Sequence, residues 1–134
     1  MTNNKNFISY GKNVYDELEV NAVLKSLKKS TQMGHSVASF EKKIAPTFAK
    51  KYGLMVNSGT SAITLALKVL DFKKGSEVIT PCLNFGTAIS CLLFANLSPI
   101  LVDCEVETLQ INIDKIEEKI TSKTKALLIP NLIG

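Results

Sequence analysis

The sequence predicts an α/β fold in which a mainly parallel sheet lies between helices. Three short runs rich in apolar residues, at 77–80, 100–103 and 125–129, alternate with segments of helical periodicity. This alternation is typical of βαβ units, in which the strands are parallel. The runs are apolar rather than alternately polar and apolar, which predicts a sheet that is covered on both faces.

Residues 1–52 are expected to form a helical arm. A helix is predicted over residues 16–27, where apolar side chains recur at helical spacing. A second helix is predicted to begin after Gly34 with Ser36 as its N-cap, because a serine side chain can accept a bond from an N–H group of the first turn. Pro46 should kink or restart this helix, because proline has no N–H to donate.

Residues 53–134 are expected to form part of an α/β domain. The apolar run at 54–56 is interpreted as a strand, and the polar turn after it leads into a helix that ends near Leu70. Gly75 marks a turn before the next strand. Further helices are predicted at 85–95 and 114–120. Because no helix follows the strand at 125–129 to cover it, we expect the domain to be truncated at its C-terminal end.

The charge and the cysteine content argue against several classes of protein. The net charge is +4, but the lysines occur as separated pairs with acidic residues among them, so no nucleic-acid partner is expected. The apolar stretch at 88–102 is broken by polar residues and a proline, so no membrane association is expected. The three cysteines form no C-x-x-C pair, which predicts neither a disulfide framework nor a metal site. They are expected to be small buried side chains of a cytoplasmic protein.

Ligands of open α/β sheets bind at the carboxyl ends of the strands, and three segments are predicted to lie there: 57–61, 81–87 and 130–134. In the first, Gly59 allows close approach of the backbone, and the hydroxyl groups of Thr60 and Ser61 can donate hydrogen bonds. The N–H groups and the dipole of the following helix would complete a phosphate site. An ordinary serine or threonine N-cap explains this segment equally well.

The second segment contains Phe85, which comes shortly after a predicted strand. An aromatic side chain at this position can stack on a planar cofactor ring. Considered alone, however, Phe85 is expected to be a core residue, since phenylalanine is among the residues most often buried.

These segments occur in an ordered series: NSGTSAITLAL from Asn57, GSEVITPCLNFGTAI from Gly75, and PILVDCEVETLQINIDKIEEKITSKTKALLIPNLIG from Pro99. The series resembles the DegT/DnrJ/StrS family, whose members are fold-type I enzymes that use pyridoxal 5'-phosphate (PLP) in sugar-nucleotide pathways. The resemblance extends over nearly all of the chain from about Lys12. It implies that residues 53–134 are the N-terminal part of the large, PLP-binding domain of such an enzyme.

The resemblance also implies roles for individual residues. Gly59, Thr60 and Ser61 match the loop that holds the PLP phosphate, and Phe85 matches the aromatic residue that stacks on the pyridine ring. Two further residues are expected to line the pocket: Thr87 and Asn131. Many relatives have a histidine where this chain has Asn131.

No catalytic residue is assigned. The family's aspartate that pairs with the pyridine nitrogen, and its Schiff-base lysine, match no residue of this chain and are expected beyond Gly134. The resemblance implies a PLP-dependent aminotransferase that acts on a nucleotide-linked keto-sugar with an amino donor, in surface polysaccharide or deoxysugar biosynthesis. It also implies a homodimer, in which the arm packs on the partner subunit.

Two other functions stay open. The patterns Phe85-Gly86-Thr87 and 131–134 are somewhat closer to the 3-dehydratases of the family, which act on nucleotide-linked 4-keto-6-deoxyhexoses and have histidine in place of the lysine. The chain could instead be a non-catalytic α/β binding module or an inactive remnant, in which the segment at 58–61 caps a helix or holds a phosphorylated ligand.

Overall fold

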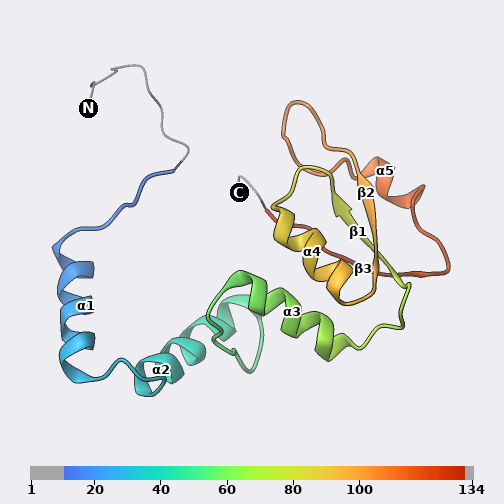
Figure 1. The fold of residues 1–134 in the computed structure, drawn as a ribbon. Coiled ribbons are helices and arrows are strands. Elements are labelled where there is room, and N and C mark those ends of the chain that lie inside the picture. The colour runs from blue at the N-terminus through green and yellow to red at the C-terminus, as the bar shows by residue number, and fades with distance from the viewer. Residues whose placement is uncertain (1–10, 132–134) are drawn as a thin grey trace. The chain divides into compact units, whose positions relative to one another are not determined.

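The computed structural model describes residues 11–131 (Figure 1). The chain forms two compact units that meet between Met55 and Val56. The first unit contains α-helices and a short 3₁₀ segment, and the second contains a parallel sheet with its helices. Every helix among the described residues is too short or too polar to cross a membrane.

Helix α1, Glu17–Lys29, begins with a capping box. The N–H of Leu18 donates to the Asp16 carboxylate (2.8 Å), and the Asp16 N–H donates to the Glu19 carboxylate (2.9 Å). These bonds satisfy donors that have no partner inside the helix, which fixes where the helix starts. The predicted helix over 16–27 is confirmed. None of its residues is buried.

Helix α2, His35–Ile44, begins earlier than the sequence predicted. Its N-cap is Gly34, and the predicted N-cap Ser36 lies inside the helix. The reason is that the Gly34 carbonyl already accepts the N–H of Ala38 (3.0 Å), so the first helical turn closes on the glycine. The predicted interruption at Pro46 is confirmed, because the chain continues as the 3₁₀ segment η1, Ala45–Phe48, with the proline in its first turn.

The predicted strand at 54–56 is wrong, since these residues form no strand. A strand needs a neighbour for its backbone groups. Here the Met55 N–H donates instead to the Glu41 carboxylate (2.7 Å). At Gly53 the backbone passes so close to α2 that an added Cβ would lie 3.0 Å from the Glu41 carbonyl oxygen, which explains the glycine.

The sheet of the second unit has three parallel strands in the order β2-β1-β3. These strands are β1, Glu77–Pro81, β2, Ser98–Val102, and β3, Thr124–Leu127. Strand β2 contains Pro99, which is tolerated because β2 lies at one edge of the sheet. The helices of this unit are α3, Gly59–Leu70, α4, Gly86–Phe94, and the short α5, Asp114–Glu117. The predicted α/β fold with a parallel sheet between helices is confirmed.

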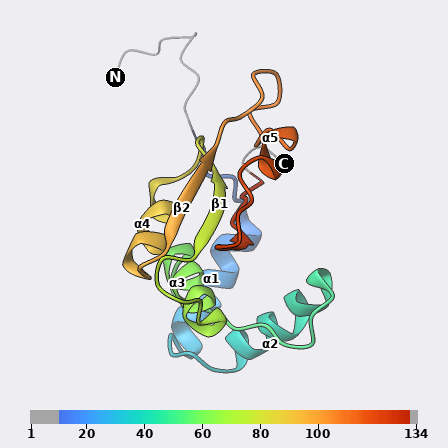
Figure 2. The ribbon, with the colours of Figure 1, turned by 90° about the vertical axis from the view of Figure 1, so that its right-hand side faces the viewer.

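The two faces of the sheet have separate apolar cores, because successive residues of β1 point to opposite sides. On the side of α3 and α4, Val78 packs with a cluster of buried side chains: Leu67, Cys91, Leu92 and Leu97. On the other side, Ile79 packs with Val102 and Ile111, and Ile116 of α5 lies against them. Figure 2 shows α4 on one side of the strands and α5 on the other.

The cysteines differ in burial. Cys91 is buried in α4, as predicted, and Cys104 is partly buried. The prediction is wrong for Cys82, which is exposed. Cys82 follows the last residue of β1, where its N–H still donates to the Val102 carbonyl (2.8 Å) but its side chain lies in the loop beyond the sheet.

Candidate functional site

A cleft of about 340 Å³ lies at the carboxyl ends of the central and edge strands β1 and β3. We call it the strand-end cleft. Its lining comes from the start of α3, the loop after β1, the start of α4 and the residues that follow β3: Gly59, Thr60, Ile63, Asn84, Phe85, Thr87, Ala88, Leu128, Ile129 and Pro130. The crossover from β1 through α4 to β2 places the start of α4 at this end of the parallel sheet, and the connection from the end of α3 into β1 does the same for the start of α3. This is the end at which α/β proteins bind ligands.

The start of α3 holds its polar side chains in a closed network. The N-cap Ser58 accepts the Ser61 N–H through its hydroxyl oxygen (3.1 Å) and donates its own proton to the Ser61 hydroxyl (3.1 Å). The Ser61 hydroxyl donates to the Asn57 side-chain oxygen (2.6 Å). The hydroxyl proton of Ser61 is therefore used within the loop, and Ser61 does not line the cleft.

Two N–H groups are left over at this helix start. In the described part of the chain, the N–H groups of Gly59 and Thr60 donate to no other protein group, whereas the Ala62 N–H makes the first helical bond to Ser58 (3.0 Å). A Cβ added at Gly59 would meet no atom within 4 Å. The capping and phosphate interpretations are thus compatible, because Ser58 caps the helix while Gly59 and Thr60, which line the cleft, keep N–H groups at the positive end of the helix dipole.

Phe85 is 74% exposed, which contradicts its interpretation as a core residue. It precedes α4, and its side chain lines the strand-end cleft together with the partly buried Thr87. Its own N–H donates to the Asn84 side-chain oxygen (2.7 Å). An exposed ring beside a small cleft has one face available for a planar ligand.

The structure brings together four of the six predicted site residues: Gly59, Thr60, Phe85 and Thr87. Asn131 is exposed at the end of the described chain and does not line the cleft, although Pro130 does. Sequence reasoning missed Asn84, whose side chain bonds both the backbone beside it and the Thr80 hydroxyl (2.9 Å). Its signal was an asparagine in a loop directly after a strand, a position where asparagine side chains often bond to the nearby backbone.

The described residues lining the cleft carry no charge. They offer backbone N–H donors, hydroxyl and amide groups and an aromatic ring. Nor do residues 11–131 contain three histidine, cysteine or acidic side chains placed to hold a metal ion. The arrangement can orient a phosphorylated, planar ligand, but it offers no side chain placed to move a proton.

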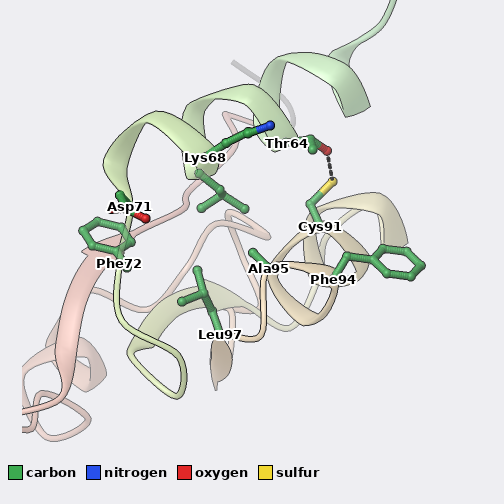
Figure 3. Close-up of a pocket in the computed structure, with 9 residues that line it drawn as sticks. Thr64, Lys68, Asp71, Phe72, Cys91, Phe94, Ala95 and Leu97 are labelled. Carbon is green, nitrogen blue, oxygen red and sulfur yellow. Dashed lines mark hydrogen bonds between the residues drawn. The ribbon is translucent and has the colours of Figure 1, made fainter.

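A second cavity, of about 290 Å³, lies between the C-terminal halves of α3 and α4 (Figure 3). The Thr64 hydroxyl and the Cys91 thiol lie 3.4 Å apart across it and share a hydrogen bond. Lys68 and Asp71 lie along its α3 side. The cavity contains none of the predicted site residues, and it lies toward the negative ends of both helix dipoles, which disfavours a phosphate.

The fold and the cleft define a class of α/β chains with a small cleft at the carboxyl ends of the strands of a parallel sheet. The sequence profile of the DegT/DnrJ/EryC1/StrS aminotransferase family matches residues 13–134, and the chain belongs to this family. It is 39% identical over 127 residues to the GDP-4-keto-6-deoxy-D-mannose 3-dehydratase of Yersinia pseudotuberculosis. The matched region covers 90% of this chain and 32% of the relative. It is 38% identical over 101 residues to the GDP-perosamine synthase of Escherichia coli O157:H7. The matched region covers 75% of this chain and 28% of the relative.

A solved structure of this group is also similar. The E. coli GDP-4-keto-6-deoxy-D-mannose-3-dehydratase with bound hydrated PLP superposes with a TM-score of 0.82 at 35% identity, over 92% of this chain and 33% of that one. The chain therefore spans about a third of the length of the relatives it matches.

Proposed function

We propose that this chain contributes the phosphate-binding and ring-stacking part of a PLP site, in an enzyme that acts on nucleotide-linked keto-sugars. One observation supports the proposal: Gly59 and Thr60, whose N–H groups have no protein partner in the described part of the chain, line the same cleft as the exposed Phe85. A volume of about 340 Å³ lies within the roughly 300–1,000 Å³ of small-molecule sites. The relatives' names supply the substrate class.

The residues present fit the phosphate end of PLP. Gly59 and Thr60 would donate backbone N–H bonds to phosphate oxygens, and the absence of a Cβ at Gly59 leaves the space for them. The network of Ser58, Ser61 and Asn57 holds the loop so that these donors need no rearrangement. Ser61 is therefore proposed to shape the loop through its side chain, in place of the direct phosphate contact that the family resemblance implied.

Phe85 would hold the cofactor ring. Its exposed side chain would cover one face of the pyridine ring and exclude water from it. When bound, PLP acts as an electron sink that stabilises negative charge developing on the substrate. The groups that would move protons belong to none of the described lining residues, so this part of the chain binds and orients only.

An aminotransferase that takes its amino group from an amino donor is the main proposal, because the family and two similar proteins carry that activity in their names. A 3-dehydratase of a nucleotide-linked 4-keto-6-deoxyhexose is the second candidate. It is favoured by the Phe85-Gly86-Thr87 pattern and by similarity to two proteins named as such dehydratases.

Reading the gene beyond the Gly134 codon separates these functions. A continuing frame with a pyridine-pairing aspartate and a later cofactor-attaching lysine would establish the aminotransferase. A histidine in place of that lysine would establish the dehydratase. A stop codon directly after Gly134 would refute both and favour the binding module or the inactive remnant.

A direct test of the site is a PLP titration of the gene product, followed by the absorbance and the induced circular dichroism of the cofactor. Binding that inorganic phosphate weakens competitively is expected, because both ligands would use the Gly59 and Thr60 N–H groups. Inorganic phosphate is added in large excess over PLP, because an uncharged cleft would hold it only weakly. Failure of phosphate to compete even in this excess would overturn the proposed position of the cofactor phosphate.

We also propose that α1 packs on the partner subunit of a homodimer. The helix buries no residue of its own, yet apolar side chains recur along it, and all are exposed: Leu18, Val20, Val23, Leu24 and Leu27. A Leu24→Glu/Leu27→Glu variant removes this apolar face without touching the core. Light scattering should then report a loss of dimer, and an unchanged dimer would contradict the proposal.

A further inference from the structure

Thr80 is the polar residue most deeply buried in the described sheet, with an exposed fraction of 0%. It lies near the carboxyl end of the central strand β1, and its hydroxyl donates to the Leu128 carbonyl just past β3 (2.7 Å). The same oxygen accepts a bond from the Asn84 side-chain amide (2.9 Å). Every buried side-chain polar atom among the described residues has a partner, so this arrangement is fully satisfied.

The Asn84 side chain links Thr80 to Phe85 through two hydrogen bonds. Its side-chain oxygen accepts the Phe85 N–H (2.7 Å), while its amide nitrogen donates to Thr80. The Phe85 ring is 74% exposed, so little packing fixes the residue. Its position is set largely through its backbone, and Asn84 is the side chain that bonds that backbone.

The donor and the acceptor of each hydrogen bond in this connection are fixed by the chemistry of the side chains. The single Thr80 proton goes to the Leu128 carbonyl, so the Thr80 oxygen can only accept from the loop. An amide is the neutral side chain of this size that donates at one end and accepts at the other. Asn84 therefore fits, whereas an aspartate would place an acceptor against an acceptor.

We propose that Thr80 and Asn84 are positioning residues, which fix the Phe85 ring relative to the β3 side of the strand-end cleft. Leu128 lines that side and Phe85 lines the other, so the connection Leu128–Thr80–Asn84–Phe85 sets the width of the cleft. The inference rests on the proposed function, since a fixed ring matters only if a planar cofactor stacks on it.

A double-mutant cycle on the complete gene product tests the inference, with PLP as the probe. Asn84→Ala should raise the dissociation constant of PLP by about threefold to tenfold and reduce the induced circular dichroism of its absorption band. In a Phe85→Ala background the same change should have almost no further effect, because the ring that Asn84 positions is absent. Additive effects in the cycle would overturn the inference.

A matched control is Asn112→Ala. The Asn112 side chain also accepts a backbone N–H, that of Lys115 (3.2 Å), but it lies outside the strand-end cleft. This variant should leave PLP affinity unchanged. A loss of PLP affinity equal to that of Asn84→Ala would indicate that loosening any loop weakens binding, and would overturn the positioning role.

Variants of the buried threonine add a second line of evidence. Thr80→Val removes the hydroxyl with little change of shape, whereas Thr80→Ser keeps both hydrogen bonds. Serine should retain the circular dichroism signal and valine should reduce it; equal signals would contradict the inference. If Phe85→Ala itself leaves PLP binding unchanged, the proposed stacking fails. If Phe85→Ala weakens binding but Asn84→Ala does not, only the positioning role fails.

Discussion

Replacing Gly59 by alanine should change stability and ligand binding in opposite directions. Gly59 is the first residue of α3, its backbone is outside the left-handed region, and an added Cβ would meet no atom within 4 Å. Alanine therefore fits the unliganded protein without strain. Because it also restricts the unfolded chain, Gly59→Ala should stabilise the unliganded protein by about 0.4–1 kcal/mol.

Binding should weaken, since the new methyl group would take up open space at a residue that lines the cleft and is proposed to donate its N–H to the phosphate. Loss of one hydrogen bond to a charged group costs about 1.5–3 kcal/mol. The dissociation constant of PLP should therefore rise about tenfold to a hundredfold. Thermal melting without ligand measures the first effect, and a PLP titration measures the second.

Gly86→Ala is the matched control for this experiment. Gly86 is the first residue of α4, and a Cβ there also meets no atom within 4 Å, but Gly86 does not line the strand-end cleft. It should give a similar gain in stability and leave PLP affinity unchanged. Equal PLP affinities for the two variants would refute the phosphate position, and a lower melting temperature for unliganded Gly59→Ala would show that the glycine serves packing.

Three further predictions concern the described fold. Leu92→Ala should lower the free energy of unfolding by about 2–5 kcal/mol, because Leu92 is fully buried. Leu93→Ala should change it little, because Leu93 is 59% exposed, and denaturant titration measures both variants. Cys82 should react with a thiol reagent in the folded protein and Cys91 should not, which mass spectrometry of the labelled protein would show. Ser58→Ala should cost about 0.5–2 kcal/mol in thermal melting, because it removes the N-cap of α3.

The sequence predicted best those elements whose signals are local. Strand β1 and helices α3 and α4 were found from apolar runs bounded by glycine, proline and polar turns, and these residues form them. Helix α5 was predicted over 114–120 but ends at Glu117. The N–H groups of Lys119 and Ile120 donate to carbonyls three residues back, so the chain tightens into turns that a helical pattern of apolar residues does not reveal.

The features that the sequence did not predict depend on which strands pair and which side chains become neighbours in the fold. A single sequence does not contain this information. The run at 54–56 has the composition of a strand, but a strand forms only where a neighbouring strand pairs with its backbone N–H and C=O groups. The assignment of Asn131 to the pocket, made from its place in the family series, stays a prediction, since Asn131 does not line the strand-end cleft and is the last described residue. Asn84 was overlooked because its importance lies in bonds to Thr80 and Phe85, which become neighbours only when the loop folds back over the end of β1.

By itself, the strand-end cleft would hold a phosphate only weakly. Its described lining has no charged side chain, so a phosphate would meet two N–H groups and one helix dipole, and an exposed dipole contributes only about 0.3–1 kcal/mol. In the proposed site, affinity for PLP would then depend on the phosphate and the ring being held together. That requirement explains why one short cleft combines a helix start with an aromatic residue, and why the position of Phe85 is tied through Asn84 and Thr80 to the centre of the sheet.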